Sequence, residues 1–367
     1  MFRLATSLTV LLAALGTPAL GADYGDNWGE TGFRESMGYE PRDWSDLGDG
    51  ADAVDTISIE AGIRYWYSLG SQSIESSGGT TIANSTAHTG ELHLRVEDKA
   101  SSTFGQGIAG YSMAISGDYT GPVISSSIED GAIGYAGADF GWNAFSDGNG
   151  NGFGGFLGYM YWNESPDTGR NNFSTLSTGD TVTYSDVTGH TFLPGDSAPN
   201  HVDINALRLG LQGKATFSNF LDFRAEVAAV PYAKVYGVMG IDDPNFSTAV
   251  YAGAAQPPYS GVANGNIMDM RSSETSIDGW GYGAMAEAFV GIHPTENLTF
   301  RLGGRAWYVQ GTADTTFDAV HITDPQDADA DPDYEVAPIV TESSYIQTNN
   351  PFSFLRYGIL AELTYAF

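Results

Sequence analysis

The C-terminal run GILAELTYAF (358–367) alternates between two kinds of side chain. Counting back from the last residue, every second position is apolar or aromatic: Phe367, Tyr365, Leu363, Ala361, Ile359 and Tyr357. The positions between them are mostly polar, charged or small: Thr364, Glu362, Leu360, Gly358 and Arg356. Because successive side chains of a strand point to opposite faces, one face of this predicted strand suits an apolar surrounding and the other a polar one.

The same alternation recurs along the chain and predicts ten strands in all. In the first of them, Ile59, Ile63 and Tyr67 share a face opposite Glu60 and Arg64. The predicted strands are 57–69, 91–97, 109–118, 132–144, 153–164, 205–217, 221–238, 281–292, 298–309 and the C-terminal run. An even number of strands of about ten residues fits a sheet that closes on itself and crosses a membrane at a tilt.

The connections between these strands alternate in length. Short links follow the second, fourth, sixth and eighth strands, whereas long loops are expected at about 70–90, 165–204, 239–280 and 310–350. Short turns on one rim, long loops on the other and both termini on the short-turn side are typical of a transmembrane barrel. We therefore predict an all-β fold, an antiparallel up-and-down transmembrane β-barrel of about ten strands. A soluble all-β secreted protein is the alternative.

Over residues 54–367 the chain resembles bacterial outer-membrane β-barrel proteins, whose last strand ends in an aromatic residue after an alternating run. The resemblance implies short periplasmic turns, long extracellular loops and outer-membrane lipid around the barrel in a Gram-negative bacterium. It also implies that the barrel-assembly machinery reads the terminal strand. Tyr365 and Phe367 are expected in the aromatic girdle at the membrane interface.

Residues before the barrel have a different composition. Residues 1–22 read as a cleaved secretory signal peptide, with Arg3 before an apolar stretch and small residues at the end. Residues 23–53 are acidic, glycine-rich and without period, which predicts a flexible periplasmic segment. The chain has no cysteine, which excludes disulfide scaffolds and thiolate chemistry. Its formal charge of −30 argues against a nucleic-acid partner.

Charged residues collect on the face of the strands that points away from lipid. We predict a charge network inside the barrel, made of Glu60, Arg64, Glu91, Arg95, Arg208, Arg224, Glu226, Glu287, Arg301, Arg305, Arg356 and Glu362. Lys214, Lys234, Glu97 and Asp139 are assigned to the same face. A ten-stranded barrel is narrow and an unpaired buried charge is costly, so these groups should pair and fill the lumen. A water-filled lumen with loosely solvated charges is the alternative.

The loops offer little catalytic chemistry. Asp327, Asp329 and Asp331 alternate in an acidic loop and are weak candidates for a divalent cation, although Pro332 rules out the glycine of an EF-hand. We predict no cofactor. Ten strands with long outer loops also resemble the omptin proteases, in which a carboxylate pair and an Asp-x-His pair activate a water. Here Asp118 and Asp242/Asp243 are the matching carboxylates, and neither place has a histidine within two residues.

Three histidines, His88, His190 and His321, could in principle replace the missing base. The sequence favours a non-enzymatic barrel for envelope structure or surface interaction, with acidic loops that bind cations or basic ligands weakly. An omptin-like protease with a rearranged site and a narrow pore for small solutes are the two alternatives.

Overall fold

The computed structural model describes residues 57–76, 79–121, 125–147, 151–167, 200–238, 267–323 and 340–367, with short pieces at 172–174, 184–185, 190–191 and 195–197. The predicted signal peptide and acidic segment lie outside the described residues. So do Asp242, Asp243 and the candidate metal ligands Asp327, Asp329 and Asp331. Among the described residues, no helix is long and apolar enough to cross a membrane.

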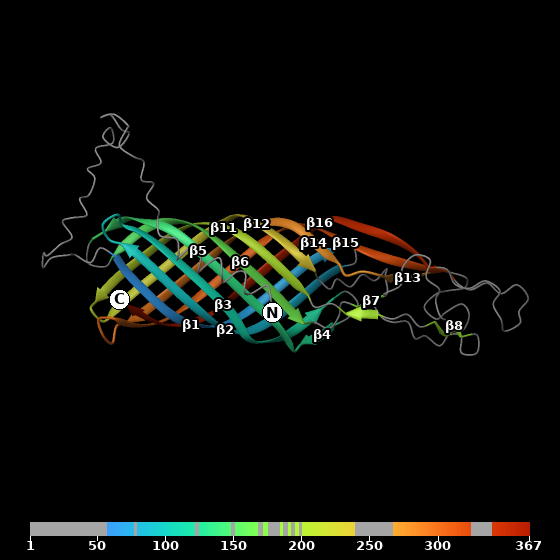
Figure 1. The fold of residues 1–367 in the computed structure, drawn as a ribbon, viewed down its shortest axis with the longest axis horizontal. Coiled ribbons are helices and arrows are strands. Elements are labelled where there is room, and N and C mark those ends of the chain that lie inside the picture. The colour runs from blue at the N-terminus through green and yellow to red at the C-terminus, as the bar shows by residue number, and fades with distance from the viewer. Residues whose placement is uncertain are drawn as a thin grey trace, which may run out of the picture. The chain divides into compact units, whose positions relative to one another are not determined.

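Ten long antiparallel strands close into a ring (Figure 1). In chain order they are β1 (Ile57–Ser76), β2 (Gly79–Asp98), β3 (Thr103–Thr120), β5 (Asp130–Ser146), β6 (Gly152–Asp167), β11 (His201–Ser218), β12 (Leu221–Val238), β14 (Ser276–Ile292), β15 (Leu298–Thr323) and β16 (Val340–Ala366). Each pairs with the next along the chain, and β1 pairs with β16 to complete the circle. The predicted up-and-down barrel is confirmed.

Shorter strands extend the sheet or lie apart from it. β4 (Ser125–Ile128) pairs with β3, and β13 (Ile267–Arg271) pairs with β15 beyond the ring. Two small two-stranded sheets are formed by β7 (Asn172–Ser174) with β10 (Gly195–Ser197) and by β8 (Tyr184–Ser185) with β9 (His190–Thr191). Figure 1 shows β13 and the long ends of β15 and β16 at the end of the barrel away from the C-terminus.

Two of the predicted long loops are largely strand. β1 reaches Ser76 and β2 begins at Gly79, so the loop expected at 70–90 is a tall hairpin. β15 continues to Thr323 and β16 begins at Val340, which shortens the loop expected at 310–350. These strand extensions are polar on the outside, so hydrophobic alternation fades there while the backbone ladder continues. The expected loops at 165–204 and 239–280 are also shorter than predicted, because their first or last residues belong to β6, β11 and β14.

The two faces of the strands lie as predicted from the alternation. Ile63 and Ile359 are each 60% exposed on the outer surface, whereas Trp66 and Leu360 are 0% exposed inside. Large aromatic side chains near the short turns also face outward, among them Trp142, Phe145, Phe217, Phe220 and Phe367. An apolar exterior with aromatic residues near its rim is the surface that a lipid bilayer solvates.

Lys234 is the exception among the assigned faces. The pairing of β12 with β14 slips between Val230 and Ala233, where Pro231 interrupts the ladder. A β-bulge of this kind inserts one extra residue and reverses the side-chain parity beyond it. Ala233 and Val235 therefore point inward, and Lys234 lies outside against Asp278, a side chain that is 71% exposed. The prediction that Lys234 faces the lumen was wrong.

The interior has two layers. The half nearer the short turns holds most of the charged side chains, and the other half is an apolar core that includes Val235, Ile277, Val309, Phe352 and Phe354. Most side chains of both layers are buried from solvent. The charged layer is therefore closed on one side by an apolar one.

Candidate functional site

The charged layer is built by the register of the strands. Across the closing seam, Arg301 pairs with Glu362, which pairs with Arg64, which pairs with Glu91. Elsewhere in the ring, Glu60 is opposite Arg95 and Glu287 is opposite Arg305. Directly opposed side chains have Cβ atoms about 5 Å apart, which is within reach of an ion pair. All of these register pairs except Glu60 and Arg95 form an ion pair across the ladder.

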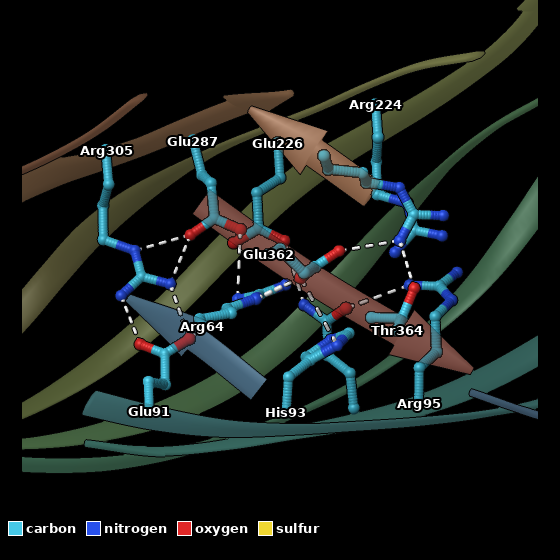
Figure 2. Close-up of polar contacts among 12 residues, drawn as sticks. Arg64, Glu91, His93, Arg95, Arg224, Glu226, Glu287, Arg305, Glu362 and Thr364 are labelled. Atoms are coloured by element: carbon cyan, nitrogen blue, oxygen red, sulfur yellow. Dashed lines mark hydrogen bonds and ion pairs between the residues drawn. The ribbon is translucent and has the colours of Figure 1, made fainter. Parts of the chain in front are cut away.

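Arg64 lies near the centre of the network (Figure 2). Its Nη1 donates to Glu91 Oε1 at 2.9 Å and lies 3.4 Å from Glu287 Oε1, and its Nε contacts Glu362. The Arg64 side chain is only 4% exposed. Contacts from three carboxylates on different strands tie β1 to β2, β14 and β16 through the lumen.

Arg305 is the most enclosed of the central bases. Its Nη1 donates to Glu91 Oε2 at 2.6 Å and its Nε to Glu287 Oε2 at 2.5 Å, with the side chain 1% exposed. Aromatic rings surround the same guanidinium: its Cζ lies 5.0 Å from the Trp66 centroid and 5.1 Å from the Trp307 centroid. Cation–π attraction is strongest where water is excluded, so the rings add to the stabilisation from the carboxylates.

A second cluster lies on the β5, β6, β11 and β12 side of the lumen. Arg208 donates to Asp139 Oδ2 at 3.1 Å and to Glu226 Oε1 at 2.8 Å. The Gln106 amide donates to both of the same carboxylates, at 2.9 Å each. Arg95 reaches this cluster by donating to Gln106 Oε1 at 2.9 Å. One arginine and one amide thus bridge the two acids, and the arginine compensates part of their charge.

The third cluster is nearest the short turns. Arg301 Nη1 donates to Glu60 Oε1 at 2.6 Å and to Glu362 Oε1 at 2.7 Å, and Nη2 lies 3.4 Å from Asp222 Oδ2. Arg224 Nη2 lies 3.2 Å from Glu60 Oε2. Of the residues predicted for the network, only Arg356 stands apart from these clusters.

Arg356 forms its own pair with Glu164 at the border of the apolar layer. The Arg356 Nε donates to Glu164 Oε1 at 2.5 Å, and its two Nη groups donate to Ser68 and Ser85 at 3.0 and 2.7 Å. The Gln72 amide donates to the other Glu164 oxygen at 2.6 Å. Arg356 is 0% exposed, so every donor of the pair is directed to a protein acceptor within the wall.

Sequence reasoning missed Glu164, Asp222, Gln106 and Tyr135. Glu164 has the same parity in its strand as the inward Met160 and Trp162, and Asp222 the same parity as Arg224, so alternation could have identified both. Tyr135 donates to Glu91 Oε2 at 2.7 Å. No sequence signal marks a neutral tyrosine or glutamine as part of a charge network.

The interior charges nearly balance among the described residues. The inward acids are Glu60, Glu91, Glu97, Asp139, Glu164, Asp222, Glu226, Glu287 and Glu362, and the inward bases are Arg64, Arg95, Arg208, Lys214, Arg224, Arg301, Arg305 and Arg356. Nine acids against eight bases leave nearly all of the formal charge of −30 to the rest of the chain. A cavity of about 20 Å³ remains between the clusters, enough for a single water molecule.

One group in this layer has the composition of a metal site. Potential ligand atoms of Glu60, His93 and Glu362 lie within 4.8 Å of one another. Both carboxylates are already engaged, Glu60 by Arg301 and Arg224 and Glu362 by Arg64 and Arg301. Three guanidinium groups at the same place repel a cation, so this trio is suited to ion pairing and not to metal ligation.

The described omptin-type candidates are not assembled into a site. Asp118 is exposed on β3, where its backbone pairs with Asn84 and Ser127. His88 lies on β2 against the outer faces of two tyrosines, 6.1 Å from the Tyr65 ring centroid and 5.2 Å from that of Tyr67. The side chains of His190 and His321 are outside the described part of the structure.

Comparison with known proteins identifies the fold. No protein-family model matches the sequence, and no curated protein matches it. Among solved structures, the chain is similar to the outer membrane protease OmpT from Escherichia coli, with a TM-score of 0.53, 8% identity and coverage of 87% of this chain and 99% of that chain.

Two further solved barrels align more loosely. The translocator domain of the autotransporter NalP from Neisseria meningitidis has a TM-score of 0.32, 10% identity and coverage of 88% of this chain and 92% of that one. A FadL homologue from Pseudomonas aeruginosa has a TM-score of 0.30, 9% identity and coverage of 85% and 90%. The likeness to OmpT shows that this chain has the fold of an outer-membrane β-barrel.

Proposed function

We propose that this protein is a non-enzymatic, non-conducting barrel of the outer membrane of a Gram-negative bacterium, exported by a cleaved signal peptide. Its interior serves stability, and its work in envelope structure or surface interaction is done by the segments outside the membrane. The outer-membrane location is supported by the apolar exterior of the ring and by the similarity in fold to OmpT. The barrel-assembly machinery is the partner expected for its insertion.

The observation that carries this proposal is the filled lumen. Arg64, Arg305 and Arg356 are each in contact with carboxylates from other strands, and the side chains of all three are 4% exposed or less. An ion crossing the barrel would have to break these pairs and then pass the apolar layer above them. Desolvating an ion without new partners costs several kcal/mol, which blocks conduction.

Conductance in planar bilayers tests the proposal. We expect the purified full chain, inserted from detergent, to give no steady single-channel current in 1 M salt, under conditions where a general porin gives large steps. Insertion is checked separately by the protection of the barrel from added protease. A reproducible steady current from inserted protein would contradict the proposal and favour the narrow pore.

The excess negative charge suits the outer segments for weak binding of cations or basic ligands. With the interior close to neutral, nearly all of the charge of −30 belongs to residues outside it. We expect a cationic peptide to bind the full chain with an affinity that falls steeply as salt rises, because exposed charges are screened. Binding that does not depend on salt would contradict this electrostatic mechanism.

An omptin-like protease remains the second candidate, because OmpT is a protease and shares the fold. Against it, Asp118 and His88 lie on the outer surface of neighbouring strands and form no described pair. We expect no cleavage of a dibasic peptide by the purified protein. Cleavage that disappears in Asp242→Asn or His321→Ala would overturn this expectation and identify the base and carboxylate in the outer segments.

A further inference from the structure

The end of the lumen nearest the short turns, called the short-turn mouth here, contains two like charges opposite each other. Lys214 on β11 is the direct cross-strand partner of Arg224 on β12. Both lie on the lumen face, Lys214 in phase with the buried Gln212 and Arg224 in contact with Glu60. On its other side Lys214 is opposite Gly152 of β6, which has no side chain to neutralise it. Like charges directly opposite on a ladder are destabilising.

Acids in the same mouth are already engaged. Glu60 Oε1 lies 2.6 Å from Arg301, while its other oxygen is 3.2 Å from Arg224. Asp222 lies 3.4 Å from Arg301 and 3.3 Å from His293. Within the described part of the chain, the Lys214 amine has no hydrogen bond or ion pair. The positive charge of Lys214 and Arg224 is therefore only partly compensated by protein groups.

A third base adds to the positive field. Arg95 lies 3.7 Å from Glu97, which also accepts from Asn143 at 2.8 Å. Figure 2 shows the Arg95 and Arg224 side chains extending toward one another from opposite walls. The side chains of Arg224 and Glu60 are 14% and 17% exposed, in contrast to the 1% of Arg305 deeper in the lumen. Solvent therefore reaches this mouth.

We propose that the short-turn mouth is a binding site for an oxyanion, a carboxylate or phosphate group held between Lys214 and Arg224. The arginine presents a planar fork of donors and the lysine a mobile point charge, a combination that suits such a group. The bound anion completes the neutralisation of the like-charged cross-strand pair, in which Arg224 has a contact with Glu60 and Lys214 has no ion pair with a described acid. The site does not depend on the function proposed above for the outer segments.

Thermal unfolding of the full chain in detergent, followed by tryptophan fluorescence, tests the site. Inorganic phosphate is titrated while sodium chloride holds the ionic strength constant, so that general screening does not change. We expect the midpoint temperature to rise and to saturate with phosphate, because a ligand that binds the folded state stabilises it. A parallel titration with phosphatidylglycerol in mixed micelles distinguishes a lipid headgroup from a soluble oxyanion.

Matched variants assign the effect to the mouth. Lys214→Met and Arg224→Met keep an unbranched side chain but remove its charge, and each should weaken the apparent phosphate affinity about tenfold or more, the value of one charged hydrogen bond. Lys99→Met, at an exposed lysine of the β2–β3 turn, should leave the affinity unchanged.

The midpoint temperature of Lys214→Met without phosphate shows whether this variant is folded. Because it removes a like-charge repulsion, its midpoint temperature without phosphate should equal or exceed that of the wild type. No rise in midpoint from either phosphate or phosphatidylglycerol would overturn the proposal. An equal rise in wild type and Lys214→Met would overturn it as well, since the anion would then bind elsewhere.

Discussion

At the scale of single residues, each buried charge inside this barrel is stable only because it is paired with others. Glu91 accepts from Arg64, Arg305 and Tyr135, so each of its oxygens has a donor. Removing one member of such a group leaves the others buried and unpaired, which costs more than the pair itself contributes. Stability should therefore be far more sensitive to a single inward charge than to an outward apolar residue beside it.

Arg305 and its neighbour Ala306 provide the test. Arg305→Leu leaves Glu91 and Glu287 without their closest donor and should lower the free energy of unfolding by about 3–5 kcal/mol. Ala306→Leu places its added carbons in an apolar hollow on the outer surface and should change stability by less than about 1 kcal/mol. Urea unfolding of both variants measures the difference. Equal tolerance of the two changes would mean that these side chains face the opposite way.

Inward charges were predictable from the sequence only as far as parity could be followed. Counting by two places Arg301, Arg305 and Arg356 correctly, because their strands are regular through those positions. The same counting fails at Lys234, because the bulge at Pro231 lies between it and the rest of its strand. Contacts across the lumen could not be predicted, since alternation gives the face of a residue and not its height in the barrel.

At the scale of elements, strand closure depends on close backbone approach at the β1–β16 seam. A Cβ placed on Gly358 would lie 1.9 Å from the carbonyl oxygen of Tyr67 on β1, a backbone atom that cannot move aside alone. Glycine at such a position permits close contact between strands. The strands were predictable where lipid imposes alternation, whereas the tall β1–β2 hairpin was not, because the outer face of residues 71–90 is mostly polar and few large apolar residues mark the inner one.

Substitution of this glycine tests the importance of the seam. Gly358→Ala should force β1 and β16 apart and lower the free energy of unfolding by about 1–3 kcal/mol. Gly90→Ala on β2 is the control, because a Cβ there meets nothing within 4 Å. The temperature at which each variant loses its folded band on a gel ranks the two. If Gly358→Ala melts no earlier than Gly90→Ala, the seam is looser than the structure shows.

At the scale of the whole molecule, neutrality inside and negative charge outside divide the chain into two functional parts. The interior is closed by paired charges at one end and by apolar packing at the other. The side-chain contacts inside such a barrel can stabilise it as much as the backbone hydrogen bonds between its strands do. What the molecule presents to its surroundings is then an apolar belt and the acidic segments beyond it.

A closed barrel with a packed lumen should resist detergent until it is heated. All ten strands of the ring have a partner on both sides, so dodecyl sulfate finds no strand edge in the ring from which to begin unfolding. We expect unheated protein from outer-membrane fractions to migrate differently on a gel from boiled protein. Arg305→Leu should shift this change to lower temperature, because the lumen pairs brace opposite walls of the ring. Identical migration before and after boiling, together with recovery in the soluble periplasmic fraction, would contradict a membrane-inserted barrel.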